Sequence, residues 1–319
     1  MTGTMHVRAI VNPNSSHGRT RGAWPRIAEA LAAQIGPLET VFTDAPLAAT
    51  ERTREALREG VDLVIAVGGD GTVNEVVNGF FAPPREDVED VPLRPEAELA
   101  VLMSGTGGDF RKTFEFAPDL HGQIQHIARG AIRTIDVGRL DYTDHQGKQA
   151  ARYFINIASF GLSGVASASV NKASFTKRIN GRFAFFMAGL RATLGYKMPR
   201  VRLQVDDQPA HEIGVNVAAI CNGRYFGGGM HMAPEARPDD GLFDVVIMHD
   251  MSTLDMLRDP NAIYRGTHIQ KPKTMHMRGR RISASPLPGP DALLDVDGET
   301  PGRLPATFTI IPSVLKFRC

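Results

Sequence analysis

The sequence predicts an N-terminal α/β domain built on a doubly wound parallel sheet, followed by a β-rich C-terminal domain of the sandwich type. Strand-like and helix-like stretches alternate over about the first 130 residues, and the run at 61–67 is too apolar for a strand with one wet face. From residue 134 onward, short β-prone runs are separated by glycine and proline. We therefore expect domains at 1–133 and 134–304, with about 305–319 as a candidate segment to return to the first domain.

Size, charge and cysteine content narrow the class of protein. The 319 residues can form two cores, and a formal net charge of +1 gives no sign of a nucleic-acid partner. Cys221 and Cys319 lack the spacing of metal ligands, so we expect neither a disulfide framework nor a zinc site, and a reducing cytoplasm is the natural setting. We expect no signal peptide and no membrane span, so that any membrane contact is peripheral.

The individual elements follow from the hydrophobic pattern. In the first domain we expect strands at 6–11, 38–42, 61–67 and 99–103, helices at 24–34, 48–59 and 73–80, and a solvated loop at 83–98. In the second domain we expect strands at 135–140, 153–158, 201–205, 214–220, 243–248, 274–277, 293–296 and 307–311, with helices at 174–194 and 254–263.

The sequence GGDGTVNE at 68–75 follows the apolar strand at 61–67. Glycines there allow a tight turn and bring backbone N–H groups against an anion, usually a phosphate. Thr72 and Glu75 have the spacing of a capping box, which predicts that a helix starts there. Asp70 would repel a phosphate alone, so it suggests a metal ion or an ordered charge network beside the phosphates. The motif is not a Rossmann fingerprint, because Asn74 stands where the third glycine should be, and it is not a Walker A loop, because no Gly-Lys-Ser/Thr follows. The alternative to a phosphate-binding turn is a plain tight connection between strand and helix.

Four further motifs lie where a ligand cleft would need them. The first is the turn NPNSS at 12–16, placed at the carboxyl edge of the sheet, where ligands bind in open α/β folds. The second is the glycine loop SGTGGDF at 104–110. The others are NGRYFGGGM at 222–230, which leads to PDDGLFDV at 238–245, and the acid-rich strand end DVDGE at 295–299. The turn at 12–16 and the strand end at 295–299 could each be a simple turn when taken alone, whereas two glycine loops at neighbouring strand ends are harder to dismiss than one.

Taken together and in this order, the five motifs resemble the diacylglycerol kinase catalytic family, which includes soluble bacterial lipid kinases and the sphingosine and ceramide kinases. The resemblance covers essentially the whole chain. The GGDGT motif alone is also shared with NAD kinases and phosphofructokinases, so the resemblance implies an N-terminal domain with the fold of those enzymes. It implies an ATP-dependent kinase that phosphorylates the hydroxyl of diacylglycerol or a related lipid alcohol, with ATP and Mg²⁺ as cofactors. The positions that match the family's nucleotide contacts are Asn12, Pro13, Asn14, Ser15, Ser16, Thr43, Gly69, Asp70, Gly71, Thr72, Val73, Asn74, Glu75 and Thr106.

The same resemblance implies a metal site and a proton acceptor. Its magnesium ligands correspond to the Asp240 carboxylate and the backbone oxygens of Arg237 and Leu242. The proton acceptor corresponds to Glu299 as first choice and Asp297 as second. One departure is Gly108, which stands where the family has asparagine; the loss of that amide implies lower activity or altered substrate choice.

The segment from Asp144 to Asp206 has no acidic residue between its ends, and its basic residues surround an apolar block at 183–190. An interfacial helix facing anionic lipid has this composition, and so has an ordinary amphipathic helix packed on its own domain. We expect a lipid substrate at the membrane surface, a cytoplasmic or inner-face location and no nucleic-acid partner, and we leave homo-oligomer formation open. The alternatives are an NAD kinase-like enzyme with a soluble acceptor and a nucleotide- or lipid-binding regulator without catalysis.

Overall fold

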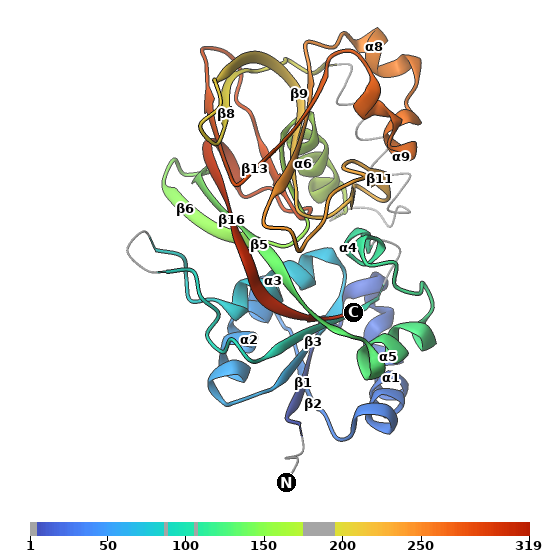
Figure 1. The fold of residues 1–319 in the computed structure, drawn as a ribbon. Helices are drawn as coiled ribbons and strands as arrows, with labels where there is room; N and C mark the ends of the chain where they lie inside the picture. The colour runs from blue at the N-terminus through green and yellow to red at the C-terminus, as the bar shows by residue number, and fades with distance from the viewer. Residues whose placement is uncertain (1–4, 86–88, 105–107, 175–194) are drawn as a thin grey trace. The chain divides into compact units, whose positions relative to one another are not determined.

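The chain forms two compact units in the computed structural model, which describes residues 5–85, 89–104, 108–174 and 195–319 (Figure 1). Unit 1 consists of residues 1–136 and 312–319, and unit 2 consists of residues 137–311. The strands β5 (Ile132–Asp144) and β16 (Gly302–Arg318) contain the points where the chain passes from one unit to the other. The sequence analysis places the same passages at 133/134 and at about 305.

Unit 1 is built on a parallel sheet with helices on both faces. The strand order is β2 (Glu39–Phe42), β1 (Val7–Val11), β3 (Leu63–Gly68), β4 (Glu98–Met103) and the end of β16. Every residue of β1 and β3 is buried, as expected for central strands of such a sheet. The helices α1 (Arg19–Ile35) and α5 (Leu120–Arg129) cover one face, and α2 (Ala48–Arg58) and α3 (Asp70–Phe80) cover the other (Figure 1).

Two helices of unit 1 start earlier than predicted, and two were not predicted. The helix α1 begins at Arg19, so that Pro25 lies inside it, after the short 3₁₀ turn η1 (Ser15–Gly18). The helix α3 begins at Asp70 with Gly69 as its N-cap. The unpredicted helices are the short α4 (Asp109–Thr113) and α5. The N-cap of α5, Asp119, accepts the N–H of Gly122 at 2.9 Å, a local signal that the sequence did contain.

Unit 2 is an antiparallel sandwich of two layers. One layer has the order β13 (Thr274–Gly279), β12 (Phe243–His249), β9 (His211–Cys221), β7 (Ile157–Gly161) and β15 (Leu294–Val296). The other has the order β8 (Arg200–Val205), β14 (Arg281–Pro286), β16, β5 and β6 (Gln149–Phe154). The long strand β9 joins the layers, because its first residues pair with β8 and its later residues pair with β7 and β12.

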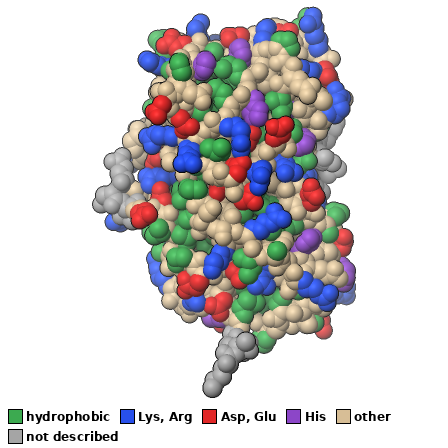
Figure 2. All heavy atoms as spheres, in the orientation of Figure 1, with side chains coloured by type: hydrophobic (Ala, Val, Ile, Leu, Met, Phe, Trp, Pro, Cys, Tyr) green, Lys and Arg blue, Asp and Glu red, His purple; other side chains and the backbone are tan. Residues whose placement is uncertain are grey.

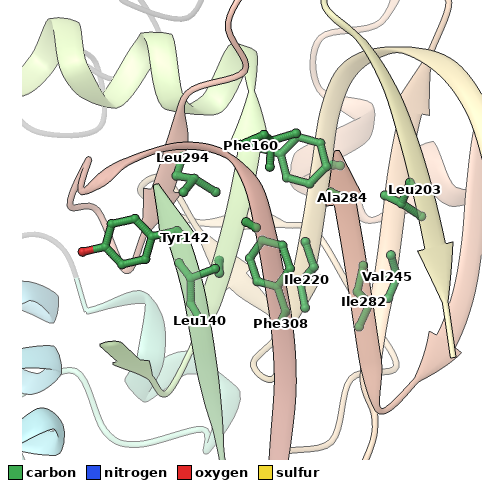
Figure 3. Close-up of a cluster of buried hydrophobic side chains, with 14 of the residues drawn as sticks. Leu140, Tyr142, Phe160, Leu203, Ile220, Val245, Ile282, Ala284, Leu294 and Phe308 are labelled. Carbon is green, nitrogen blue, oxygen red and sulfur yellow. The ribbon is translucent and has the colours of Figure 1, made fainter. Parts of the chain in front are cut away.

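The core of unit 2 lies between these layers. Figure 3 shows Leu140, Phe160, Ile220 and Phe308 pointing toward one another from β5, β7, β9 and β16, and all four side chains are fully buried. Because the side chains of a strand alternate between its two faces, the neighbours of Ile220 on β9, Ala219 and Cys221, point away from this core and pack with Phe226 of the motif at 222–230.

The remaining elements of unit 2 differ from the sequence expectations in four places. The predicted strand at 153–158 is two strands, β6 and β7, separated at 155–156, and the predicted helix at 254–263 is two short helices, α8 (Thr253–Arg258) and α9 (Ala262–Arg265). The strand β14 and the helix α6 (Leu162–Ser174) were not predicted. Beyond Ser174, the predicted helix at 174–194 lies outside the described residues. The hairpin β10 (Tyr225–Phe226) and β11 (Met230–His231) and the turn η2 (Thr267–Gln270) complete unit 2.

Two surface properties bear on the expected membrane contact. Among the described helices, none combines the length and the apolar character needed to cross a bilayer. On the face of the described chain drawn in Figure 2, acidic and basic side chains are intermixed, so that face presents no broad field of one sign.

Candidate active site

The glycine turn of unit 1 joins β3 to α3. A Cβ atom on Gly68 would lie 2.4 Å from Oγ1 of Thr72, so the backbone of the turn approaches the helix more closely than any other residue would allow. The first-turn N–H groups of α3 have no acceptor within the helix, and together with the helix dipole they provide an anion-binding end. The position of Gly69 to Glu75 at a strand-to-helix turn therefore agrees with the sequence analysis.

The predicted capping box at Thr72 and Glu75 is wrong. Thr72 lies in the first turn of α3, and its Oγ1 accepts a hydrogen bond from Nδ2 of Asn12 at 3.1 Å. Glu75 points to another helix, because its Oε2 accepts the backbone N–H of Ala49 at 3.1 Å, at the start of α2. Both side chains thus bond to residues distant in sequence instead of forming the capping box that their spacing predicted.

The turn at 12–16 is organised by Asn12. Its Oδ1 accepts the N–H of Asn14 at 3.0 Å, and its carbonyl accepts the hydroxyl of Ser15 at 2.8 Å, which closes the turn after β1. Ser15 Oγ lies 2.7 Å from Oγ1 of Thr20, and that hydroxyl also contacts the Ser104 hydroxyl after β4. The three hydroxyl groups thus connect the turn after β1 to the loop after β4. Thr20 carried no signal in the sequence.

Asp70 closes the glycine loop after β4 onto the glycine turn. Its Oδ2 accepts the N–H groups of Gly108 at 3.0 Å and Asp109 at 3.3 Å, and its Oδ1 accepts that of Phe110 at 3.3 Å. Burial raises the pKa of the Asp70 carboxyl, with a further contribution from the negative charge of Asp109, while the three N–H groups act in the opposite direction. Asp70 therefore has a positioning role that the sequence did not reveal, in addition to its predicted place beside phosphates.

The acid-rich strand end of unit 2 is a tight hairpin turn. Val296 and Glu299 exchange backbone hydrogen bonds of 2.8 and 2.9 Å, and the two residues between them, Asp297 and Gly298, have φ values of 48° and 90°. Positive φ at both central positions defines a type I′ turn, for which Asp-Gly is a preferred sequence. The turn leaves the Glu299 side chain exposed and Asp297 buried.

Asp297 is held by the linker between β6 and β7. Its Oδ1 accepts the N–H groups of Asn156 at 3.2 Å and Ile157 at 3.0 Å, and its Oδ2 accepts that of Ile155 at 3.1 Å. The motif at 222–230 reaches the same linker, because Nδ2 of Asn222 donates to the Ile155 carbonyl at 2.8 Å. In addition, Nδ2 of Asn156 donates to the Tyr225 carbonyl at 2.9 Å. These contacts span 67 or more positions of sequence and bring the two motifs together on the linker.

Asp295 lies beneath the same turn. It is buried on β15, and its Oδ1 accepts the N–H of Gly298 at 3.1 Å. Burial raises the pKa of Asp295 to about 7; the Ser167 hydroxyl of α6 counteracts this effect, and the negative charges of Asp297 and Glu299 add to it. The sequence showed Asp295 only as a member of an acid-rich strand end, with no role of its own.

Comparison with known proteins agrees with this architecture over both units. Residues 6–140 match the diacylglycerol kinase catalytic domain, and residues 156–319 match the YegS C-terminal NAD kinase beta sandwich-like domain. A diacylglycerol kinase of Staphylococcus epidermidis is 32% identical over 261 residues, which cover 82% of this chain and 75% of the relative. The chain belongs to the diacylglycerol kinase family. The resemblance inferred from the five motifs is confirmed.

Further relatives of the diacylglycerol kinase family extend the match. A diacylglycerol kinase of Staphylococcus saprophyticus is 28% identical over 302 residues, which cover 94% of this chain and 91% of the relative. A solved structure of a candidate diacylglycerol kinase from Bacillus anthracis superposes with a TM-score of 0.76 at 23% identity, covering 100% of this chain and 98% of that one. The predicted fold class, an α/β domain with a β-rich sandwich domain, is confirmed.

The predicted nucleotide-binding residues all belong to unit 1, but they differ in what they offer a ligand. The Val73 and Asn74 side chains are fully buried, so they support the turn and are not themselves accessible to a ligand. Thr43 follows β2 and is buried, with its N–H donating to the Val11 carbonyl at 2.9 Å, while Asn14 is exposed. Pro13, Ser15, Ser16, Gly69 and Gly71 lie on the turns already described, and Thr106 lies outside the described residues. Their contact with a nucleotide stays a prediction.

The predicted magnesium ligands lie in the turn that precedes β12. Oxygen donors of this kind suit Mg²⁺, but the carboxylate of Asp240 already has partners. Its Oδ1 accepts the N–H of Leu242 at 3.1 Å, and its Oδ2 forms an ion pair with Arg278. The exposed Arg237 side chain pairs with Asp239 at 3.4 Å. Within the described residues, no three His, Cys, Asp or Glu side chains converge as a metal site, and a site with a single carboxylate stays a prediction.

Proposed function

We propose that this chain is an ATP-dependent lipid kinase that transfers the γ-phosphoryl group to the hydroxyl of diacylglycerol or a related lipid alcohol. Family membership supports kinase activity on a lipid, and the diacylglycerol kinases named above suggest the acceptor. The observation that carries the residue assignment is the turn at 296–299, where one carboxylate is engaged by backbone N–H groups and the other is exposed.

The geometry of this turn supports different roles for its two acids, which the resemblance ranked as Glu299 first and Asp297 second for the proton acceptor. Asp297 accepts three backbone N–H groups, so it holds the turn and the β6–β7 linker in place. Glu299 is exposed, and the backbone bonds between Glu299 and Val296 fix where its side chain leaves the turn. We therefore assign Glu299 as the general base and Asp297 as the residue that positions it.

In the proposed reaction, the lipid hydroxyl oxygen forms a bond to the γ-phosphorus of ATP while the bond from that phosphorus to the β,γ-bridging oxygen breaks. The hydroxyl proton passes to Glu299, and ADP leaves with the bridging oxygen. General-base assistance of this kind contributes about 10²–10⁴ in rate. The N–H groups at the start of α3 bind phosphate oxygens. Asp70 holds residues 108–110 beside the start of α3 by accepting their N–H groups. Mg²⁺ carried by ATP would supply neutralisation of phosphate charge.

Gly108 is compatible with this proposal. It is the N-cap of α4 (Asp109–Thr113) with φ 83°, a left-handed conformation that glycine and asparagine both adopt more readily than other residues. Its N–H donates to Asp70, so the backbone contact of the loop survives without an asparagine side chain. The relatives that align with most of this chain are named diacylglycerol kinases, which does not favour the NAD kinase-like enzyme or the inactive regulator.

The test is transfer of labelled phosphate from ATP to a panel of lipid alcohols in mixed micelles, with NAD as the competing soluble acceptor. We expect labelled lipid, a fall in kcat of about 10²–10⁴ for Glu299→Gln with unchanged thermal stability, and a smaller fall in kcat with lower stability for Asp297→Asn. Labelled NADP, or nucleotide binding without any transfer, would refute the proposal. Equal activity of Glu299→Gln and the unaltered protein would refute the assignment of the base.

We further propose that the lipid is reached at the inner face of the membrane, with the protein bound there peripherally. The basic composition of the segment between Asp144 and Asp206 supports this proposal. Sedimentation with vesicles that contain or lack anionic lipid tests it, and equal pelleting with both would contradict it. The same samples in a sedimentation velocity run measure whether the protein forms homo-oligomers.

A further inference from the structure

The acidic turn that precedes β12 forms an ion pair with an arginine of the neighbouring strand β13. The guanidinium group of Arg278, on β13, contacts two carboxylates: its Nη2 pairs with Oδ2 of Asp240, and its Nε lies 3.5 Å from Oδ2 of Asp244. Asp244 is buried, with 1% of its side chain exposed, and its Oδ1 also lies 2.6 Å from Nε2 of His276. Asp240 and Asp244 are thus paired with side chains of the neighbouring strand β13.

Strand pairing fixes this arrangement. Asp244 and Arg278 are directly opposite each other in the antiparallel ladder of β12 and β13, so their side chains lie on the same face of the sheet. Asp240 reaches the same guanidinium from the turn, where Gly241 adopts φ 71° and Leu242 donates its N–H to the Asp240 carboxylate. A planar guanidinium with several donors can serve two carboxylates at once, which a lysine ammonium does less well.

The same carboxylate of Asp240 is the only charged ligand in the predicted magnesium site. A guanidinium and a divalent cation carry charges of the same sign, and two like charges a few ångströms apart around one carboxylate repel each other. A metal ion could bind at Asp240 only if the Arg278 side chain moved away, which would also leave the buried Asp244 with less compensation.

We propose that Arg278 takes the place of a divalent cation in this chain: it holds the turn at 237–242 to β13, and it excludes Mg²⁺ from Asp240. The proposal concerns the turn alone. It does not depend on the Mg²⁺ that accompanies ATP or on the identity of the lipid acceptor.

The experiment measures the thermal midpoint of the nucleotide-free protein in chelator and in millimolar Mg²⁺ or Mn²⁺. We expect the unaltered protein to show equal midpoints in all three conditions. Arg278→Gln should have a lower midpoint in chelator and should regain about 2–4 °C with Mg²⁺ or Mn²⁺, because the freed carboxylate then binds the cation. The double variant Arg278→Gln/Asp240→Asn should lose this gain. The matched control is Arg258→Gln on α8, an exposed arginine that forms an ion pair with Asp255 at 3.8 Å, and it should remain insensitive to metal.

Two results would overturn the proposal. One is metal-dependent stabilisation of the unaltered protein that disappears in Asp240→Asn; the other is an Arg278→Gln variant that gains nothing from either cation. Calorimetric titration of Mn²⁺ into the unaltered protein and into Asp240→Asn gives a second measurement that does not require the arginine variant to fold, and identical titrations are expected. None of these measurements uses ATP or lipid, so a failure here is distinct from a failure of the proposed kinase activity.

Discussion

Nδ2 of Asn12 donates a hydrogen bond of 3.1 Å to Oγ1 of Thr72, across 60 positions of sequence. The bond joins the turn after β1 to the first turn of α3, whose N–H groups form an anion-binding end. Asn12 also caps its own turn through the Asn14 N–H, so one side chain sets the shape of one loop and its distance from the next. The two loops therefore act as one structural element.

This pair predicts coupled effects on nucleotide binding. Asn12→Ala and Thr72→Val should each raise the KM for ATP several-fold, and the double variant should be less impaired than the sum of the single effects. We expect a coupling free energy of about 0.5–1.5 kcal/mol, the range of one hydrogen bond between neutral groups. The measurement is ATP affinity of the four proteins in a double-mutant cycle, and strictly additive effects would show that the bond has no part in forming the site.

A second prediction concerns the three N–H groups that Asp70 accepts. Asparagine in this position has only one acceptor oxygen, so Asp70→Asn leaves at least one N–H of residues 108–110 without its partner. We expect a loss of about 1–3 kcal/mol in the free energy of unfolding and a weaker affinity for ATP. Asp119→Asn is the control, because asparagine caps a helix as well as aspartate does, and it should leave stability nearly unchanged. An Asp70→Asn protein of normal stability would contradict the role of Asp70 in holding residues 108–110.

The fold could be predicted well wherever burial alone decides the structure. The strands β1, β3 and β4 are apolar because they are covered on both sides, and the sequence shows this directly. The strand β14 was missed because its sequence, RISASP, is polar and ends in proline, and it becomes a strand only through its partners β8 and β16. Its conformation is imposed by tertiary pairing, which no local pattern reports.

The candidate site was predictable by its motifs but not by its contacts. The type I′ turn at Asp297-Gly298 follows from local preference, so the motif and its geometry agree. The proposed division of roles between Asp297 and Glu299 depends on N–H groups about 140 residues away, and the ion pair of Asp240 depends on Arg278, which is 38 residues away. Such distant partners are set by the assembled sheet, so sequence spacing could not identify them.

A third prediction separates backbone strain from catalysis in the turn at 296–299. Gly298 has φ 90° with open space around its missing Cβ, so Gly298→Ala strains the backbone without a clash. We expect a cost of about 1–2 kcal/mol in the free energy of unfolding, together with a marked fall in kcat because Glu299 is displaced. Gly147 is a matched control, since it also has positive φ, at 80°, and open space, in the turn between β5 and β6. Gly147→Ala should lose similar stability and keep its kcat; an equal loss of kcat in both variants would count against the role of Glu299.

The last prediction concerns the pH dependence of stability caused by Asp295, whose pKa is raised by burial from 3.8 to about 7. Below the pKa of the unfolded chain, both states hold the proton, and between that value and about 7 only the folded state holds it. Stability should therefore fall as the pH rises through this window, by about 1.4 kcal/mol for each pH unit, and become level above it.

Asp295→Asn tests this dependence, because its amide cannot ionise and it preserves the size of the side chain that faces α6 and Ser167. Relative to the unaltered protein, the variant should gain in free energy of unfolding between about pH 4 and pH 7, measured by urea denaturation at several pH values. Asp291→Asn, with 66% of the Asp291 side chain exposed, is the control in the same segment and should follow the unaltered protein at every pH. A constant difference between Asp295→Asn and the unaltered protein across this range would show that Asp295 is ionised throughout, and that the turn carrying Glu299 rests on a charged group instead of a protonated one.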